Sequence, residues 1–405
     1  MTEAGVALPE LFTDKTGWGR FARTPFQTRE WYSAAGFADR AHLISADGAG
    51  VPVWTDADPD HYYHSPRQIL TGHLERAFLG SSWPGRIGTV GERWGPVATT
   101  VSPYGYRGGA FAPEGAALDG LAVELIRHAR HQGAGLVMSH YLFDGEDDEW
   151  LRALRSAGAE PLVLGAQCVL DVEWASAAEY YAELGGSRRS IRQRYAQWQR
   201  NGYTVRVRPV DEPCDDRETD QVVRLFAEHA RRHGDSSPPL GLYRTLATGT
   251  GGVARLLLTV SEGATLRSAL AVLVWGDTLF PKCFGSDHPQ VDYLPLVYDE
   301  VVALAVTGRH RRVDYGGGAH QAKLFRGATL RYALGALSAD PASPFGAALL
   351  AHAKDLSTRK LTHFRDLAIR WHRGHLAPPM PGILSQNDKD RELVEMSVRN
   401  TRGDR

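Results

Sequence analysis

Hydrophobic residues in the first half of the chain occur in short blocks whose spacing alternates between that of strands and that of helices. One block has apolar residues at intervals of three and four positions, which predicts an amphipathic helix that ends near Gly133. These residues are Leu118, Leu121, Leu125 and Ile126. Other blocks predict strands over 51–55, 86–92, 96–103, 135–143 and 161–172, and helices over 73–80 and 147–158.

The second half, from about Glu173 onward, repeats this alternation. Apolar residues at helical spacing predict a long helix from Glu218 to His233. Two apolar runs around glycine turns, at 253–263 and 268–285, have the pattern of a hairpin. The remaining elements are helices over 176–202 (in two pieces), 242–249 and 294–308, and strands over 203–210, 312–318 and 333–340.

This order of elements predicts an α/β (α+β) fold with two halves of similar size. We expect the halves to cover residues 1–172 and 173–345, and a helical, basic extension to cover 346–405. The length of 405 residues agrees with two or three domains at roughly 150 residues each.

Composition and charge narrow the functional classes. Hydrophobic residues make up 43% of the chain and charged residues 23%, which is typical of a folded globular protein. The 46 Lys and Arg residues are balanced by 47 Asp and Glu residues, so the net charge is −1. This balance excludes a histone-like, polybasic mode of nucleic-acid binding but allows a local basic patch, because a patch depends on how charges are distributed.

Cysteine use and the N-terminal sequence indicate a cytoplasmic protein. Cys168, Cys214 and Cys283 stand far apart and form no CxxC pair, which argues against a disulfide framework and a structural zinc site. The first twelve residues, MTEAGVALPELF, lack the basic and apolar regions of a secretory signal. No stretch approaches the ~20 apolar residues that a membrane span requires.

Several common site motifs are missing from the sequence. The histidine pairs at 61–64 and 128–131 lack a cysteine partner and the HExxH spacing of a zinc helix. There is no GxSxG elbow, no Walker A motif and no GxGxxG turn in a strand–turn–helix context. We therefore expect no metal site and no bound cofactor.

A run of five arginines in thirteen residues is the densest positive charge in the chain. They are Arg188, Arg189, Arg192, Arg194 and Arg200. With Tyr195 and Trp198 between them, they suit phosphate contacts and base stacking, as in tRNA binding; the alternative is a solvated helix face. A second candidate RNA surface is the basic extension, with Lys354, Arg359, Lys360, Arg365, Arg370 and Arg373.

Four segments, in this order, resemble parts of the tandem GNAT proteins that are grouped with the Fem-type peptidyl and aminoacyl transferases, often labelled FemAB-like. They are TPFQTREWYSAAG (24–36), SPYGYRGGAF (102–111), RRSIRQRYAQWQRNGYTVRV (188–207) and the stretch from CFGSDHPQ to AKLFRGA (283–328). The resemblance spans most of residues 20–345 and implies two GNAT-like modules in tandem. Each motif is loose alone, and their order is more specific for the fold than for the substrate.

The resemblance implies roles for individual residues. Lys323 matches a family lysine at the acyl-transfer site, where a protonated amine could stabilise an oxyanion or hold a phosphate. Arg326, one helical turn away, could hold a second phosphate or a carboxylate. Tyr104, Tyr106 and Arg107 would border the acceptor pocket. Alternatively, Lys323 and Arg326 are solvated charges beside a glycine turn. The loop of Tyr104, Tyr106 and Arg107 would then be a turn that is packed by aromatic rings.

A glycine triplet and four candidate bases complete the expected site. Gly316, Gly317 and Gly318 follow a predicted strand and would form either a phosphate or substrate cradle or a flexible turn. An amine that attacks an ester must lose a proton, so a base is needed. The candidates are Asp287, His288, Asp314 and His320, each also compatible with a structural role.

The absence of a CoA-binding motif from the sequence favours aminoacyl-tRNA as the acyl donor. GNAT modules that use acetyl-CoA carry a (Q/R)xxGx(G/A) loop whose backbone N–H groups hold the pyrophosphate. Neither TVGERWG nor GAFAPEGAALDG has this spacing. Fem-type proteins also lack the loop, because their acyl group arrives esterified to tRNA.

We therefore expect a Fem-type N-acyltransferase. It would move an aminoacyl group from aminoacyl-tRNA to an amine or related nucleophile of a small acceptor, such as a specialised metabolite or a peptidoglycan precursor. The alternatives are an acyl-CoA-dependent GNAT enzyme and a GNAT-like protein that recognises a ligand without catalysis.

Overall fold

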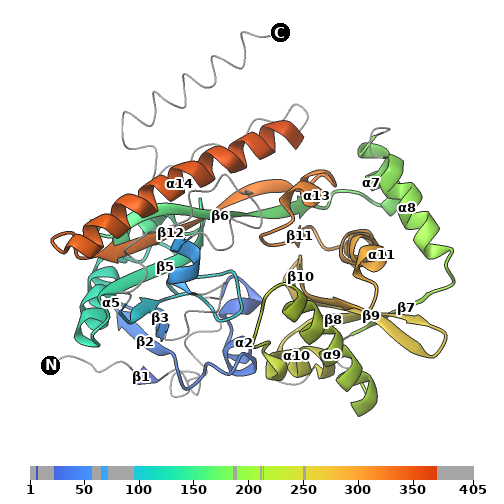
Figure 1. The fold of residues 1–405 in the computed structure, drawn as a ribbon, viewed down its shortest axis with the longest axis horizontal. Coiled ribbons are helices and arrows are strands. Elements are labelled where there is room, and N and C mark those ends of the chain that lie inside the picture. Colours follow the sequence, from blue (N-terminus) through green and yellow to red (C-terminus); the bar gives the residue numbers. More distant parts are fainter. Residues whose placement is uncertain are drawn as a thin grey trace, which may run out of the picture.

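A computed structural model gives the fold of the chain (Figure 1). The structure describes residues 6–7, 22–56, 65–71, 95–185, 189–209, 212, 214–249 and 252–371. The elements expected at 73–80 and 86–92 lie outside these ranges, as do Arg188, Arg373 and the histidine pair at 61–64.

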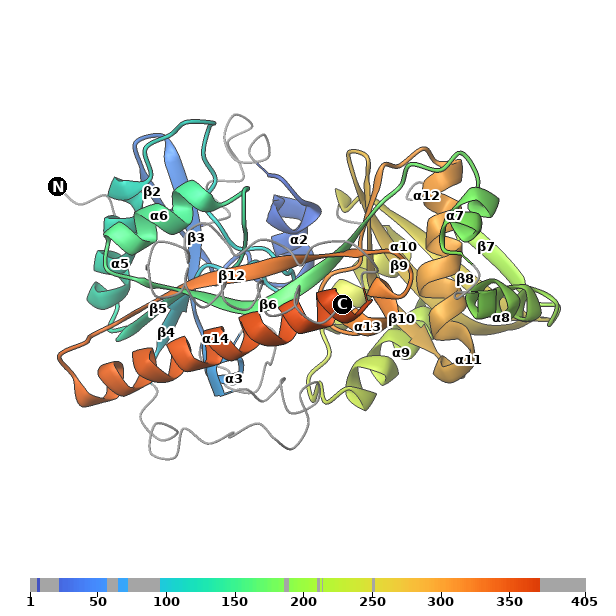
Figure 2. The same ribbon diagram turned by 90° about the horizontal axis from the view of Figure 1, so that it is seen from above.

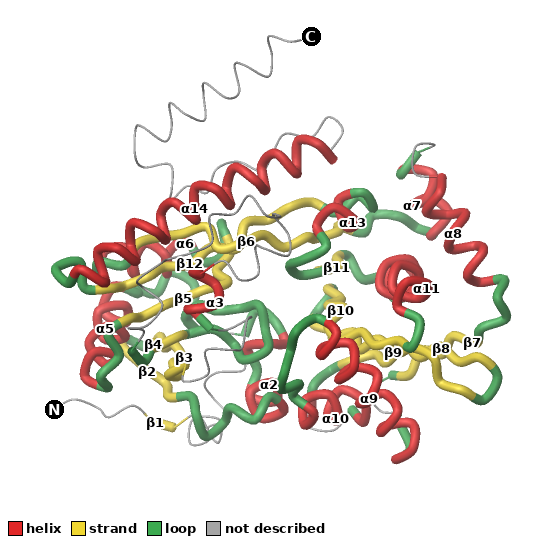
Figure 3. The backbone as a smooth tube through the Cα atoms, in the orientation of Figure 1, coloured by secondary structure: helices red, strands yellow, loops and turns green. Residues whose placement is uncertain are grey.

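Twelve strands of the described chain form one sheet, in the order β1-β2-β3-β4-β5-β12-β6-β11-β10-β9-β8-β7 (Figure 3). The strands are β1 (Val6–Ala7), β2 (His42–Ala46), β3 (Ala49–Asp56), β4 (Val97–Thr99), β5 (Leu136–Phe143), β6 (Glu160–Asp171), β7 (Thr204–Arg208), β8 (Arg255–Glu262), β9 (Thr265–Trp275), β10 (Thr278–Ser286), β11 (Arg312–Asp314) and β12 (Thr329–Ala339). The expected α/β fold is confirmed.

The helices cover both faces of this sheet (Figure 1 and Figure 2). They are η2 (Pro25–Gln27), α2 (Arg29–Ala34), α3 (Pro66–Thr71), α5 (Asp119–His131), α6 (Asp148–Ser156), α7 (Ala177–Glu183), α8 (Arg189–Gln199), α9 (Asp216–Arg232), α10 (Leu240–Thr248), α11 (Pro289–Leu294), η6 (Pro295–Glu300), α12 (Val301–Thr307), α13 (His320–Leu324) and α14 (Pro344–Trp371). No helix of the described residues is long and apolar enough to cross a bilayer.

Strand β12 joins the two halves of the chain. It lies between β5 and β6, pairing antiparallel with both, and Leu337 stands opposite Met138 while Leu330 stands opposite Cys168. The sequence assigned residues 333–340 to the second half, but the strand completes the sheet of the first. Strand β12 therefore follows the second half in the sequence but belongs to the sheet of the first half in space.

Successive side chains of β5 point to opposite faces of the sheet and are mostly apolar on both, so helices pack against both faces. Val137 and Leu142 belong to the core beneath α5 and α6, whereas Leu136 and Met138 belong to the core beneath α14. Every position of β5 is buried, as a strand covered on both faces requires. The helical extension expected from 346 is confirmed as α14, which packs along β6 and β12 (Figure 2).

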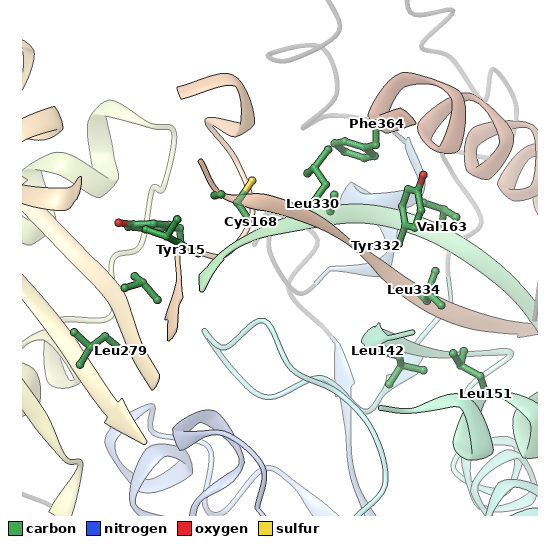
Figure 4. Close-up of a cluster of buried hydrophobic side chains, with 14 of the residues drawn as sticks. Leu142, Leu151, Val163, Cys168, Leu279, Tyr315, Leu330, Tyr332, Leu334 and Phe364 are labelled. Atoms are coloured by element: carbon green, nitrogen blue, oxygen red, sulfur yellow. The ribbon is translucent and has the colours of Figure 1, made fainter. Parts of the chain in front are cut away.

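One hydrophobic core continues from the first half into the second. Figure 4 shows it running from Leu151 of α6 and Leu142 of β5, past Leu334 of β12, to Leu279 of β10 and Tyr315. Because this core is shared, the two halves support one another.

The second half places its helices around an opening in the sheet. Strands β10 and β11 pair in parallel only at Thr278 with Arg312 and at Leu279 with Val313. Helices α9 and α10 pack on one face, and the helical segment from α11 to α12 packs on the other. The helix expected over 294–308 is present; it begins earlier, at Pro289, and contains a π-helical turn, η6.

Candidate active site

A cavity of about 830 Å³ lies between the two halves, where β10 and β11 stop pairing. This volume is within the range of small-molecule sites. Its walls include predicted residues from distant parts of the chain: Tyr104, Tyr106 and Arg107 from the first half, and Gly316, Gly317, Gly318 and Lys323 from the second. The structure therefore brings these seven residues together around one cavity.

Lys323 is buried and holds the glycine loop. Its ammonium nitrogen donates to the carbonyl oxygens of Tyr315 at 2.8 Å, Gly316 at 3.0 Å and Gly317 at 2.7 Å. Three protons thus meet three acceptors. Burial lowers the pKa of Lys323 to about 8, and the nearby Cys168 opposes this shift. With only 4% of the residue exposed, Lys323 is not a solvated charge beside the loop.

Asp314 faces the same cavity from the end of β11. Its carboxylate accepts the Gln167 side-chain amide at 3.0 Å and the Gly316 backbone N–H at 2.8 Å. Burial raises the pKa of Asp314, and the Gly316 N–H and Lys323 oppose this. Of the four candidate bases, Asp314 is the one among the residues that line the cavity.

A cluster of charged residues around the buried Arg107 forms part of the cavity wall. Arg107, only 2% exposed, contacts Glu146 at 2.9 Å and Asp147 at 3.1 Å, and Arg331 contacts Glu146 at 2.5 Å. Although burial opposes it, the guanidinium groups of Arg107 and Arg331 lower the pKa of Glu146. Arg107 is thereby held in place rather than free in the cavity.

The loop that carries Tyr104, Tyr106 and Arg107 depends on close backbone contact at Gly108. A Cβ atom there would lie 2.2 Å from the carbonyl oxygen of His140. We expect Gly108→Ala to lower the free energy of unfolding by about 1–3 kcal/mol, because the loop must move to admit a methyl group. Urea denaturation measures this.

A matched control for this prediction is Gly165→Ala in β6. A Cβ atom at Gly165 meets nothing within 4 Å. We expect this change to alter the unfolding free energy by less than about 1 kcal/mol. Equal effects of Gly108→Ala and Gly165→Ala would contradict the proposed packing of the loop.

Positive charge dominates the cavity lining. Among the described residues, seven lysine and arginine residues line it against three carboxylates. An anionic group, such as a phosphate or a carboxylate, is therefore attracted to this space. One of the seven, Lys282 of β10, was missed by sequence reasoning. The signal was a single lysine inside the apolar run of a strand, since a charged residue in a buried strand needs a reason.

Comparison with known proteins identifies the fold. No protein-family model and no curated protein matches the sequence. Among solved structures, the chain is similar to L-PGS from Bacillus licheniformis, with 12% identity, a TM-score of 0.50, and 87% of this chain and 98% of that chain covered. The chain has a FemAB-like tandem GNAT fold. At this level of identity the likeness shows the fold alone.

Two further structures share the likeness more weakly. FemX is 10% identical, with a TM-score of 0.47, and the match covers 83% of this chain and 97% of FemX. A tandem GNAT protein from the clavulanic acid biosynthesis pathway is 11% identical, with a TM-score of 0.40 and coverage of 82% and 94%.

Two predicted catalytic residues do not reach the cavity of this tandem GNAT fold. The Asp287 carboxylate forms a two-point contact with Arg224 of α9 at 3.0 and 3.1 Å, on the surface. The His320 side chain is packed beside β6, with Nε2 2.7 Å from the carbonyl oxygen of Ala166, and burial lowers its pKa to about 4. Both residues lie outside the described set that lines the cavity, as does His288.

Arg326 lies behind the cavity. Its guanidinium group stacks over the Tyr298 ring at 4.7 Å and donates to the carbonyl oxygen of Ala322 at 3.2 Å. With 4% of the residue exposed, it is not a solvated charge, and it is also outside the described lining. Lys360 of α14 is buried too and donates to the carbonyl oxygen of Leu164 at 2.7 Å, so it does not belong to a basic surface.

Helix α8 carries the arginine run at the outer end of the second half (Figure 2). Arg189, Arg192 and Arg194 are exposed. Trp198 is buried and donates its ring N–H to Asp292 at 3.1 Å, so its ring is packed in the core rather than offered for base stacking. None of the described residues that line the cavity belongs to α8.

Helices α11 and α5, which follow the parallel-paired strands β10 and β4, are poor sites for a pyrophosphate. Helix α11, after β10, begins with Pro289, which lacks an N–H, and is preceded by Asp287. Helix α5, after β4, has Asp119 in its first turn, and the Asp47 carboxylate would lie 3.1 Å from a Cβ atom at Gly120. Carboxylates at a helix N-terminus repel an added anion.

Proposed function

We propose that this protein is a Fem-type N-acyltransferase that moves an aminoacyl group from aminoacyl-tRNA to an amine of a small acceptor. The observation that carries the proposal is the cavity between the two halves. It combines the glycine loop held by Lys323, the carboxylate of Asp314 and an excess of positive charge.

Catalysis would depend on positioning and on charge. An aminoacyl ester is already activated, so the site must align the acceptor amine with the ester carbonyl. Attack of the amine converts this carbonyl oxygen into an oxyanion. The charge of Lys323, held beside the glycine loop, would stabilise the oxyanion. The volume of the cavity, about 830 Å³, fits a small acceptor together with the aminoacyl end of the donor.

Charge distribution favours tRNA over acyl-CoA as the donor. The carboxylates near the first turns of α5 and α11 disfavour the pyrophosphate of CoA. Arg189, Arg192 and Arg194 stand exposed on one helix and suit contacts with the phosphates of a nucleic acid.

One observation favours the second candidate, an acyl-CoA-dependent GNAT enzyme. The cavity occupies the opening between β10 and β11, and a linear pantetheine chain would fit between two separating strands. A direct test of the donor therefore decides between the two functions.

We expect transfer from charged tRNA that RNase abolishes. Purified protein is incubated with total tRNA charged with labelled amino acids, and separately with a panel of acyl-CoAs, and acceptor-dependent loss of the acyl group is measured. We expect binding of tRNA to weaken as salt increases, because phosphate contacts release counterions. Saturable CoA binding without a response to tRNA would instead establish the acyl-CoA function, and no response to either donor would indicate ligand recognition without catalysis.

Charge reversal on α8 locates the tRNA surface. We expect the double substitution Arg192→Glu and Arg194→Glu to weaken tRNA binding by at least about tenfold at 0.1 M salt, since two phosphate contacts are lost. Arg231→Glu on α9 is a matched exposed control on another helix and is expected to change the affinity much less. Equal losses in both variants would show that α8 does not make specific contacts.

A further inference from the structure

Lys282 is an amine in the cavity wall without a polar partner. Its side-chain nitrogen lies over the rings of Tyr106 at 4.6 Å, Phe26 at 5.5 Å and Trp31 at 5.9 Å. The described residues provide it with no hydrogen bond and no ion pair. Ring faces alone therefore stabilise its charged form, and they do so weakly compared with a carboxylate.

The carboxylates that line the cavity are committed elsewhere. Glu146 is paired with Arg107 and Arg331. Asp314 accepts two N–H groups, and Asp235 accepts the backbone N–H of Ser237 at 3.0 Å. A carboxylate that would hold Lys282 in its charged form is thus missing from the described lining.

The other titratable groups near Lys282 come from three elements. They are Tyr104, Tyr106 and Arg107 of the 102–111 loop, His229 and Arg232 of α9 with His233 directly after it, and Cys283 of β10. Both arginines are paired, Arg107 with Glu146 and Asp147 and Arg232 with Glu228. Burial lowers the pKa of His229 to about 4, so this imidazole is neutral near pH 7. Burial likewise lowers the pKa of Lys282 to about 8, with Cys283 opposing the shift.

The proposed reaction needs a base in this place. An acceptor amine is mostly an ammonium ion near neutral pH and then has no lone pair with which to attack. Asp287, His288 and His320 lie outside the described lining of the cavity, and the Asp314 carboxylate already accepts two N–H groups. Lys282 faces the cavity with no hydrogen-bond partner among the described residues. We infer that Lys282 is the general base that removes a proton from the acceptor ammonium. This role rests on the proposed function and assigns a chemical class to the acceptor, a protonated amine.

The reaction transfers a proton to Lys282 and exchanges a C–O bond for a C–N bond. The neutral amine of Lys282 takes one proton from the acceptor ammonium, which frees the lone pair of the acceptor nitrogen. That lone pair forms the new C–N bond, and the electron pair of the ester C–O bond leaves with the ribose oxygen of the donor. The attacking nitrogen loses its extra proton to this oxygen, and the proton on Lys282 passes to solvent. An amide and a free hydroxyl result.

We test this role with Lys282→Met, which keeps a long apolar side chain among the three rings. We expect kcat to fall by about 10²–10⁴-fold with little change in the KM of the acceptor. In the unaltered protein, log kcat should rise with pH up to the pKa of Lys282, about 8, because the free amine is the active form. At higher pH it should fall, because Lys323, whose pKa is also lowered to about 8, loses the charge that stabilises the oxyanion. The Lys282→Met variant should lose the rising limb.

The substitution Lys282→Arg distinguishes a general base from a residue that binds an anionic substrate group. Arginine keeps the positive charge and cannot accept a proton at these pH values. We expect it to be as slow as Lys282→Met. An active Lys282→Arg, or a Lys282→Met with raised KM and unchanged kcat, would show that Lys282 binds an anionic substrate group and would overturn the proposal.

A measurement that needs no turnover distinguishes failure of this role from failure of the proposed function. Acetic anhydride acylates only neutral amines, so its rate of reaction against pH, followed by mass spectrometry, titrates each lysine. We expect Lys282 to titrate near pH 8. Titration of Lys282 only at about pH 10, as for a lysine in water, would overturn the base role. A protein that uses no donor would overturn the function itself, whereas full-rate transfer by Lys282→Met would overturn this role alone.

Discussion

Replacing Lys323 with alanine should lower the rate of acyl transfer by at least about 100-fold while the chain still folds. The substitution removes the positive charge beside the oxyanion of the proposed reaction and leaves three carbonyl groups of the glycine loop without their donor. The loop would then lose its fixed position at the cavity. Steady-state kinetics with the established donor measures the rate, and circular dichroism verifies the fold.

Lys360→Ala is the matched control for this prediction. Lys360 is also a buried lysine that donates to a backbone carbonyl group, but it lies under α14 and outside the described lining of the cavity. We expect Lys360→Ala to lower stability and to leave kcat unchanged. A full rate in Lys323→Ala would remove Lys323 from the mechanism, and an equal loss in both variants would indicate a general effect of lost stability.

Asp292→Ala should lower the free energy of unfolding by about 3–5 kcal/mol. Asp292 is fully buried and is paired with Arg267 at 3.0 Å. It also accepts the hydroxyl groups of Ser268 at 2.6 Å and Ser286 at 2.7 Å. The variant would leave a buried guanidinium group without this partner, and the Ser286 hydroxyl and the Trp198 ring N–H without their acceptor. Urea denaturation measures the loss.

Asp287→Ala is the control from the same region. Asp287 is also paired with an arginine, Arg224, but both side chains are exposed to solvent. Exposed pairs contribute about 0–1 kcal/mol, so we expect a small change in unfolding free energy. The same variant tests Asp287 as a catalytic residue. An undiminished kcat would remove it from the candidates, and equal destabilisation by both variants would contradict the assigned role of the Asp292 cluster.

Two groups of predicted residues show which parts of the site a local motif can identify. Gly316–Gly318 and Lys323 lie close in the sequence, and the loop of Tyr104, Tyr106 and Arg107 is one continuous motif, so each group could be recognised locally. Their meeting in one cavity could not, because it depends on how the two halves pack. Trp198 shows the converse: its spacing with the arginines suited stacking on a base, whereas its ring N–H is committed to a buried carboxylate.

Sequence periodicity by itself determined several local elements, although β2 and α3 were not predicted. The predicted helix ending near Gly133 is α5, and the strands predicted at 135–143 and 161–172 are β5 and β6. These assignments succeed because the spacing of apolar residues reports which face of an element is buried.

Only the tertiary structure decided which strands pair and which side chains lie beside one another. The apolar run of β12 suits any strand that is buried on both faces, and nothing in its spacing specifies a place between β5 and β6. The same holds for Lys282, whose neighbours come from α2 and from the 102–111 loop, far away in the sequence. Pairing and charge environment are set by contacts between distant segments, which a local pattern does not contain.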